Sequence, residues 1–595
     1  MRRVCTVLAL ASCCLLQVVT PAAGATRSAL SLARGRSEGL RAFGGLPDRA
    51  TTAASSTSAS DPEAPVPVAP SIVPPSGRRL SSDRVLEIAD RLPKMRGVRA
   101  KYRGSYGGAY LKGPGRWQVS YFSRPGKEIG QVIIADANGR VLEQWTGFQV
   151  AWTMARGYPG AFGRHVNALY IWLPLCLLFL VPFVDWRRPF SLLHLDLLAL
   201  LSFSVSLAFF NHGHIYASVP LTYPPLVYLL VRMLAIVGLG ERASRPWRSW
   251  IPAPWLAVGV VFLLGFRIGL NVTDSNVIDV GYAGVIGAQR IAEGKPLYGH
   301  YPSDNEHGDT YGPVNYEAYV PFEQIFGWSG TWDDLPAAHA AAIFFDVLAV
   351  GLLFLIGMRV RGPTLGVGLA YAWVSYPFTL YALESNSNDM IVAVLVLAAL
   401  LLASSPPARG VFAALAGLAK FAPLALAPLF ATHGLTELPY RRRPLALGLF
   451  VGAFALTTLL VGIPAFAHDS LHEIYERTIA YQQNRGSPFS VWGLYGGLHA
   501  EQTAVEAGAV LLALLLAVVP RRPGIPALAG AAGAILIALQ LGLEHWFYLY
   551  VPWFFGLVMI ALLGTAVQLG EDPTQSPAAP DAASGPARSN PLAVA

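Results

Sequence analysis

Two carboxylates, Asp274 and Asp279, follow a hydrophobic run over residues 255–271. They lie three and eight residues past the end of the run, where a membrane span would bring them to the boundary between lipid and water. A carboxylate at such a boundary can accept the proton of a hydroxyl group. We expect Asp279 to be the catalytic base, because residues 280–289 can form a short interfacial helix whose N-terminal end keeps it ionised. Asp274 is the alternative base.

Two cations complete this chemistry. Lys420 is the only lysine within the hydrophobic runs, and a helix that starts near Arg409 would carry it about 16 Å into the bilayer at 1.5 Å per residue. A lysine at this depth requires an anionic partner, either a substrate phosphate or a carboxylate. The alternative interpretation is a structural ion pair with Asp346. Arg485, in a polar segment outside the membrane, is a second phosphate ligand or a contact to lipid headgroups.

Aromatic and polar side chains near these charges suggest sugar binding. Tyr311, Trp328 and Trp492 can stack on sugar rings, although the same residues would also suit an aromatic belt at the membrane surface. His545, within Glu544-His545-Trp546, lies at the outer end of a predicted span and is a second candidate for acceptor binding. We expect neither a metal ion nor a cofactor, because we find no cluster with the spacing of metal ligands.

The composition defines the class of protein that presents these residues. Hydrophobic residues make up 53% of the 595 residues and charged residues only 13%, whereas a soluble domain carries about a quarter charged residues. The net charge of +8 comes from arginines in short loops, for example residues 187–188, 359–361, 441–443 and 521–522. Such loops lie on the cytoplasmic side of membrane proteins. The charge therefore indicates orientation in a membrane and no nucleic-acid partner.

The N-terminal part precedes the membrane. Residues 1–25 combine two arginines, an apolar run and a small-residue cleavage site, which is typical of a secretory signal peptide. A lipoprotein signal ending at Cys13 is the alternative. Residues 26–79, rich in Ala, Ser, Pro and Arg, are predicted to be a disordered linker.

A small α+β domain is predicted over residues 80–150. A helix over residues 82–92 ends at Pro93, and strands follow over residues 116–122, 131–135 and 140–145, with a turn at residues 136–139. This order resembles a PepSY domain, a small extracytoplasmic module. The alternative is a structural cap without a ligand.

Hydrophobic runs then follow one another near the length of about 20 residues that crosses a bilayer. Three additional spans are predicted within residues 165–250, and the rest lie in a catalytic domain over residues 251–567. Residues 568–595 form a predicted disordered cytoplasmic tail. The eleven predicted spans are residues 166–184, 192–210, 219–238, 255–271, 337–358, 365–383, 390–403, 445–461, 505–519, 525–541 and 547–567.

Residues 410–431 do not fit a simple crossing. If they crossed the membrane once, the three arginines at 441–443 would lie outside, against the charge rule. Pro423 and Pro428 disfavour one continuous helix. We therefore predict a re-entrant helical hairpin, with residues 410–421 dipping into the membrane and the following residues returning.

Several motifs together resemble the GT-C glycosyltransferases, most closely family 87, the polyprenyl-phosphate-mannose-dependent mannosyltransferases. The motifs are Asp279 after an outward span, Gly-Lys-Pro-Leu-Tyr298, Tyr311-Gly-Pro-Val-Asn-Tyr, Asn388-Asp389, and Gly-Leu-Ala-Lys420-Phe-Ala-Pro. The resemblance implies an all-α polytopic fold that transfers a sugar, with inversion, from a polyprenyl-phosphate donor to a glycan or glycolipid acceptor outside the cell membrane. It assigns substrate binding to Asn388 and Asp389. The chain differs from the family by its N-terminal extension and by Asn388-Asp389 in place of a glutamine-asparagine pair.

Independent chemical reasoning agrees with this interpretation. A lipid phospho-sugar has a good leaving group, so one base and cations for the departing phosphate suffice. Two other functions stay open: a transporter or flippase of lipid-linked sugars, and a membrane assembly or signalling protein without catalysis. We find no internal repeat of the kind that many transporters contain.

Overall fold

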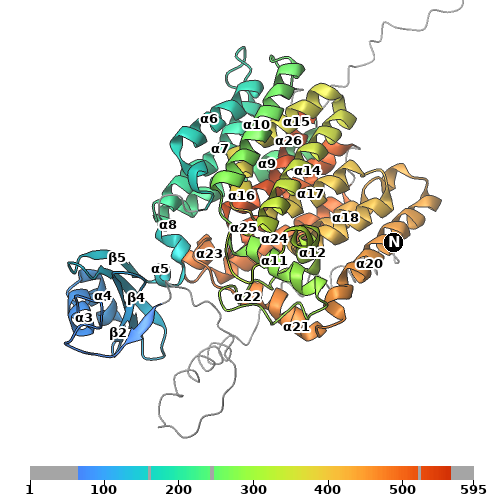
Figure 1. Cartoon of the computed structure of the whole chain (residues 1–595). Helices are drawn as coiled ribbons and strands as arrows, with labels where there is room; N and C mark the ends of the chain where they lie inside the picture. Colours follow the sequence, from blue (N-terminus) through green and yellow to red (C-terminus); the bar gives the residue numbers. More distant parts are fainter. Residues whose placement is uncertain (1–64, 158–161, 241–246, 520–523, 565–595) are drawn as a thin grey trace, which may run out of the picture.

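A computed structural model describes residues 65–157, 162–240, 247–519 and 524–564. The predicted signal peptide, most of the predicted linker, the arginines at 521–522 and the predicted cytoplasmic tail lie outside the described residues. The described chain consists of a small α+β domain joined through a connector to a large helical domain (Figure 1).

The small domain is a five-stranded antiparallel sheet with strand order β1-β2-β3-β4-β5 and two helices. Its core is apolar and includes Val85, Trp117 and Val132. The strands are β1 (Val66–Val68), β2 (Tyr106–Leu111), β3 (Arg116–Phe122), β4 (Glu128–Ala135) and β5 (Val141–Thr146), and the helices are α3 (Ser82–Asp90) and α4 (Pro93–Lys101). The predicted helix and the three predicted strands are all present.

The predicted linker was assigned too far along the chain. Residues 66–68 form β1, which pairs with β2, and the backbone N–H groups of Arg79 and Leu80 donate to the carboxylate of Asp136 at 2.9 to 3.1 Å. Asp136 also accepts the indole N–H of Trp117 at 2.9 Å. The composition of this segment is typical of a linker, but these long-range hydrogen bonds fix it to the domain.

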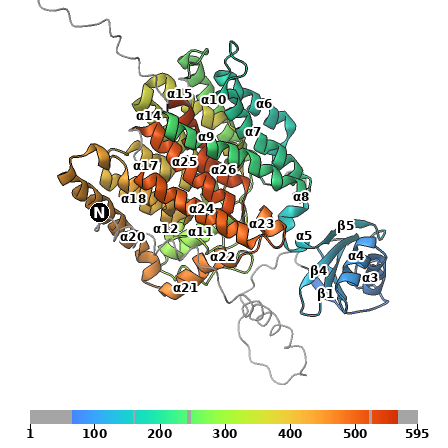
Figure 2. The ribbon, with the colours of Figure 1, turned by 180° about the vertical axis from the view of Figure 1, so that it is seen from behind.

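The connector leaves β5 through the short helix α5 (Phe148–Ala151) and the 3-10 turns η1 (Thr153–Arg156) and η2 (Arg164–Asn167). Both views place α5 between the small domain and α23 (Val491–Leu494) of the helical domain (Figures 1 and 2). The connector therefore brings a segment from before the first predicted span against a segment near the end of the chain.

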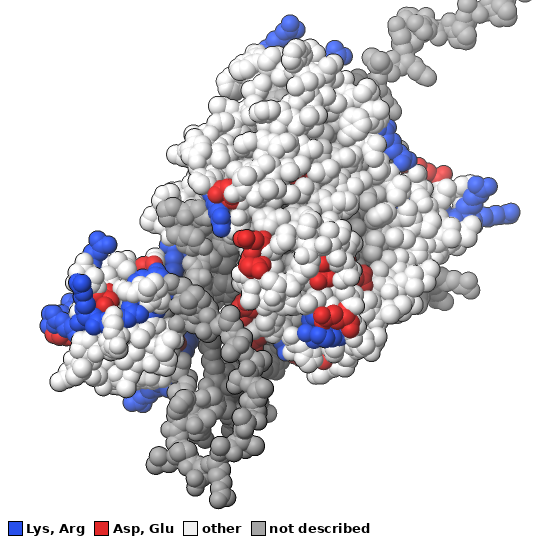
Figure 3. Space-filling model, in the orientation of Figure 1, with Lys and Arg blue, Asp and Glu red and all other residues white. Residues whose placement is uncertain are grey.

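Helices make up the rest of the described chain. They form one large apolar core and a second, smaller one around α11 (Asp279–Ala292) and α12 (Pro313–Glu317). Much of the outer surface in the view of Figure 3 is free of charged side chains. The helices are α6 (Leu169–Leu180), α7 (Leu192–Asn211), α8 (Ile215–Ser218), α9 (Tyr223–Leu239), α10 (Ala253–Asp274), α11, α12, α13 (Val320–Phe326), α14 (Pro336–Arg361), α15 (Pro363–Ser375), α16 (Pro377–Glu384), α17 (Asp389–Leu401), α18 (Pro406–Ala419), α19 (Ala427–Thr432), α20 (Arg443–Phe466), α21 (Leu471–Tyr475), α22 (Tyr481–Asn484), α23, α24 (His499–Val518), α25 (Ile525–Gly542) and α26 (Val551–Gly564).

Seven helical segments within the described residues are long and apolar enough to cross a membrane, which makes the chain a multi-pass membrane protein. They are Leu192–Asn211, Ile215–Leu239, Ala253–Asp274, Pro336–Arg361, Tyr440–Phe466, His499–Val518 and Ile525–Gly542. Shorter apolar helices cover Leu169–Phe183, Asp389–Leu401 and Tyr548–Gly564. The run at 365–383 is two helices, α15 and α16, because Pro377 begins the second one. The count of eleven spans stays a prediction.

The chain reverses direction after α18. Lys420 has an extended backbone with φ −141° and ψ 139°, and a 3-10 turn, η6 (Ala422–Leu426), and α19 follow it. The guanidinium of Arg409 donates to the backbone carbonyls of Phe430 at 2.8 Å and His433 at 3.0 Å. The two ends of residues 409–433 therefore meet, as a hairpin requires. That this hairpin is re-entrant in a membrane stays a prediction.

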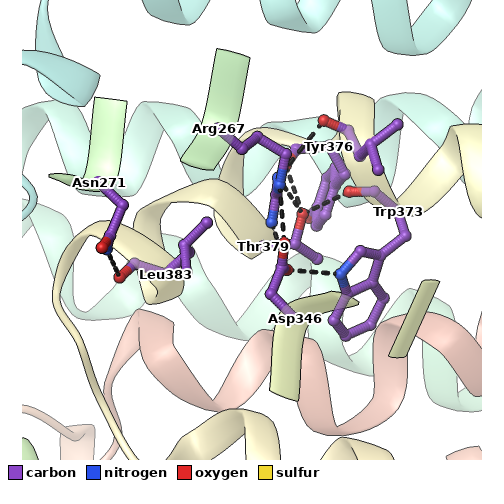
Figure 4. A network of polar contacts seen from close by, with 8 residues as sticks. Arg267, Asn271, Asp346, Trp373, Tyr376, Thr379 and Leu383 are labelled. Atoms are coloured by element: carbon purple, nitrogen blue, oxygen red, sulfur yellow. Dashed lines mark hydrogen bonds and ion pairs between the residues drawn. The ribbon is translucent and has the colours of Figure 1, made fainter. Parts of the chain in front are cut away.

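One buried ion pair joins α10, α14 and α15 (Figure 4). Arg267 donates to both carboxylate oxygens of Asp346, at 3.1 and 2.5 Å, and Asp346 also accepts the indole N–H of Trp373 at 2.8 Å. Arg267 donates in addition to the hydroxyl of Thr379 at 3.2 Å. The alternative that Lys420 pairs with Asp346 is therefore wrong: arginine matches the two oxygens of a carboxylate better than lysine does.

Candidate active site

The segment before Asp279 is held in place by the turn after α16. The backbone N–H groups of Asn276 and Ile278 donate to the carbonyls of Glu384 and Ser385, both at 3.2 Å. Asn386, which has φ +47°, donates its side-chain N–H to the carbonyl of Asn276 at 3.0 Å. These contacts fix the direction in which the chain enters α11.

A close approach explains a glycine in the first turn of α11. A Cβ atom on Gly281 would lie 2.2 Å from the carbonyl oxygen of Asn386, so a larger residue would push α11 away from the turn. The helix predicted over residues 280–289 exists as α11, but most of its residues are buried against α12 and α13 and not spread on the membrane surface.

Asp279 is the first residue of α11, and its side chain lines an open cavity of about 50 Å³. Among the described residues, its carboxylate accepts only the N–H of its neighbour Val280, at 2.9 Å, while the side-chain N–H of Asn305 donates to its backbone carbonyl at 2.9 Å. Although the side chain is exposed to the cavity, the protein packed around it reduces its solvation, which raises its pKa, and the positive charge of Arg485 opposes this shift. A carboxylate of raised pKa that contacts a cavity is suited to accept a proton.

The structure separates the two candidate acids. Asp274 is the last residue of α10, so the helix continues past the predicted end at Asn271. Its carboxylate contacts the ring of His165 and accepts the backbone N–H of the same residue at 3.1 Å. The cavity is lined by Asp279 and not by Asp274, because Asp274 is directed toward the connector.

Lys420 lies at the end of α18 and forms an ion pair with Asp389, the first residue of α17. Its Nζ lies 2.5 Å from the carboxylate, which also accepts the indole N–H of Trp553 at 3.0 Å. The lysine is buried and lies 5.0 Å from the ring centroid of Tyr311, which lines the cavity. The carboxylate partner that the sequence required for Lys420 is therefore Asp389, and Tyr311 separates this pair from the cavity.

The motif around Tyr311 explains this arrangement. A Cβ atom on Gly312 would lie 1.9 Å from the carbonyl oxygen of Leu418, so only glycine lets the backbone touch the end of α18. Tyr311 is thereby brought next to Lys420. The motif that ends at Tyr298 is anchored further away, where the carboxylate of Asp469 accepts the backbone N–H groups of Leu297 and Tyr298 at 2.9 and 3.3 Å.

Arg485 follows α22 and lines the same cavity as Asp279. Among the described residues, no carboxylate lies within ion-pair distance of Arg485, and no cationic group lies within that distance of Asp279. The two charges act on each other, because Arg485 lowers the pKa of Asp279. This pair of unneutralised groups is the main chemical feature of the cavity.

His545 lies beside these charges without lining the cavity. Its Nδ1 lies 2.9 Å from the hydroxyl of Ser487. Burial and the charges of Arg485 and Lys420 hold its pKa well below the usual range of histidine. The ring is therefore neutral at physiological pH and can donate or accept one hydrogen bond.

Two buried amides have no partner in the described part of the chain. Asn388, which was predicted to bind substrate, and Asn315, which was not, each have a side-chain nitrogen and oxygen without a hydrogen bond. Such groups are rare because each costs free energy. Asn315 belongs to the motif that starts at Tyr311, so the motif itself was the signal that could have found it.

The two predicted tryptophans lie elsewhere. Trp492 donates its indole N–H to the carbonyl of Leu541 at 2.8 Å and packs against Tyr223 of α9. Trp328 packs against Tyr282 and donates to the carbonyl of Thr331 at 3.1 Å. Neither lines the cavity of Asp279.

The apolar helices and the open, charged cavity define a multi-pass membrane protein with a polar site suited to proton transfer. Residues 310–543 match the model of glycosyltransferase family 87. Over these residues the chain is similar to glycosyltransferase family 87, and this match identifies the protein as a glycosyltransferase. No curated protein and no solved structure matched the chain.

The match covers part of the cavity. It contains Tyr311, Lys420 and Arg485, whereas Asp279 precedes it and His545 follows it. It favours a transferase over the transporter and the non-catalytic membrane protein that the sequence left open.

Proposed function

We propose that the protein transfers a sugar from a polyprenyl-phosphate donor to a glycan or glycolipid acceptor, and that this sugar is mannose. The transfer takes place with inversion on the extracytoplasmic face of the cell membrane. One observation carries this proposal: Asp279 and Arg485 line one cavity, and neither has a charged partner of its own among the described residues.

The two groups match the two needs of the reaction. The carboxylate of Asp279 accepts the proton of the acceptor hydroxyl as its oxygen forms a bond to the anomeric carbon. The bond from that carbon to the phosphate oxygen breaks on the opposite side, and its electron pair leaves with the phosphate. Arg485 binds the departing phosphate through its planar set of N–H donors.

Lys420 has a second place in this scheme. Its charge is partly neutralised by Asp389. We assign to Lys420 the stabilisation of the phosphate charge from behind Tyr311, while Arg485 binds the phosphate directly. Asn388 and Asn315 offer donors and acceptors to sugar hydroxyl groups, since their amides have no partner among the described residues. We assign Tyr311 to substrate contact, because its ring lies between Lys420 and the cavity. His545 is proposed to bind the acceptor, and Trp492 is proposed to stack on a sugar.

The arginine-rich loops support the orientation. With residues 359–361 and 441–443 in the cytoplasm, Asp279, the small PepSY-like domain and the cavity face outward. The hairpin of residues 409–433 is then re-entrant, because both its ends lie on the cytoplasmic side while Lys420 reaches into the membrane.

The test uses purified protein in liposomes with radiolabelled polyprenyl-phosphate mannose and a lipid-linked glycan fraction as acceptor. We expect a radiolabelled product whose formation is lost in Asp279→Asn and kept in Asp274→Asn. Unlabelled polyprenyl-phosphate glucose is added as a competing donor. If the enzyme uses mannose, the glucose donor should not lower formation of the radiolabelled product. Movement of the donor across the bilayer without product, or full activity of Asp279→Asn, would contradict the proposal.

A further inference from the structure

A tryptophan of the connector reaches the candidate active site from outside the matched family region. Trp152 directly follows α5. The centre of the Arg485 guanidinium lies 5.3 Å from the centroid of its ring. The ring of His545 lies 5.7 Å away on one side, and Phe489 packs edge-on at 5.3 Å.

The connector holds Trp152 rigidly in this place. It crosses the turn between α7 and α8 so closely that a Cβ atom on Gly157 would lie 2.2 Å from the backbone nitrogen of Gly213. Arg156 donates to the carbonyls of Gln149 and Val150 at 2.8 and 3.1 Å, which closes the segment around Trp152. The additional helices therefore serve as a support for the connector.

The contact supplies Arg485 with a partner that leaves its charge available. An arginine side chain has many rotamers, and a carboxylate partner would hold it in place but neutralise the charge that a phosphate needs. The face of an indole ring attracts a guanidinium without neutralising it. The N–H groups of Arg485 thus stay available for an anion in the cavity.

We propose that Trp152 is a positioning residue that holds Arg485 over the cavity, so that the N-terminal part of the chain completes the phosphate site. This proposal rests on the assignment of Arg485 to the donor phosphate. It gives the small domain and the additional helices, which precede the match to the family, a direct role at the site.

The test compares Trp152→Ala with Trp152→Phe in purified protein. Trp152→Ala should raise both the KM and the Kd for polyprenyl-phosphate mannose by roughly 2- to 30-fold, which corresponds to the free energy of a cation–π contact. It should change kcat little. Phenylalanine should restore part of the loss. Trp186→Ala is the matched control, because Trp186 also precedes the match to the family, is 73% exposed and is not the aromatic ring that contacts Arg485.

A double-variant cycle separates this proposal from the function on which it rests. In an Arg485→Gln background, Trp152→Ala should change donor Kd by less than about 2-fold, because the contact is already lost. An equal loss in both backgrounds, or an equal loss in Trp186→Ala, would overturn the positioning role. If Arg485→Gln itself leaves donor binding unchanged, the assignment of Arg485 fails instead.

Discussion

Two of the sets of arginine and aspartate in the helical domain differ in how they are neutralised. Arg267 and Asp346 are buried, bind each other through two hydrogen bonds and have further partners in Trp373 and Thr379. Asp279 and Arg485 line one cavity without an ion pair between them. The first set leaves no charge for a ligand and joins helices, whereas the second leaves both charges for a substrate.

The difference has a general physical reason. A buried charge destabilises a fold unless a partner compensates for it, so paired charges are consistent with a structural role. Charges that stay unpaired next to a cavity need another explanation, and substrate binding is the simplest one. Lys420 and Asp389 combine features of both sets: they form an ion pair, as the structural set does, but Lys420 contacts Tyr311, which lines the cavity.

The largest effect is expected for Asp279→Asn. Loss of the general base should lower kcat by about 10²- to 10⁴-fold, measured as sugar transfer in liposomes. Thermal stability should not fall, because the raised pKa of Asp279 means that its ionised form does not favour folding at neutral pH. If Asp279→Asn unfolded at a clearly lower temperature than the unchanged protein, Asp279 would have a structural role like that of Asp346.

Arg267→Met should lower the stability of the fold and should have a smaller direct effect on the transfer reaction than Asp279→Asn. It leaves Asp346 buried without its partner, which costs about 3 to 5 kcal/mol and lowers the yield of folded protein in size-exclusion chromatography. Arg267→Met combined with Asp346→Leu is the control and should recover most of the loss. Normal stability of the single variant would remove the contrast between the two sets.

Arg485→Gln should weaken donor binding. Loss of hydrogen bonds to a charged phosphate is worth about 1.5 to 3 kcal/mol, or about 10- to 150-fold in the Kd for donor. Arg485→Lys keeps the charge but not the planar donors, so its Kd for donor should lie between those of the unchanged protein and of Arg485→Gln. Titration with radiolabelled donor measures both, and unchanged binding in Arg485→Gln would refute the assignment.

The pH dependence tests the coupling between Asp279 and Arg485. Since the base must be ionised, kcat/KM should fall as the pH falls through the pKa of Asp279, above the ordinary value of about 3.9 for aspartate. Removal of Arg485 takes away a charge that lowers this pKa, so the acid limb of Arg485→Gln should move to higher pH. An acid limb that does not move would show that the two groups are not coupled.

The smallest effect is expected for Asp274→Asn. Its partner is the partly exposed His165 of the connector, and exposed ion pairs contribute only about 0.2 to 1 kcal/mol. Transfer activity should therefore stay within about threefold of the unchanged protein. A loss comparable to that of Asp279→Asn would reverse the choice between the two acids.

The sequence by itself determined the class of protein and most of its elements. Hydrophobic runs, proline positions and alternating strands are local signals, so they predicted the apolar helices, the break near Pro423, the helix after Asp279 and the strands of the small domain. The family motifs also predicted a glycosyltransferase. Composition misled only at residues 65–79, where long-range hydrogen bonds decide the structure.

The tertiary structure decided which charges meet. Lys420 could pair with several acids by depth alone, and only the packing of α17 against α18 selects Asp389 over Asp346. Likewise, no local pattern relates Trp152 to Arg485, which lie 333 residues apart in the sequence. Side-chain partners depend on the distances between packed helices, and those distances result from the fold of the whole chain.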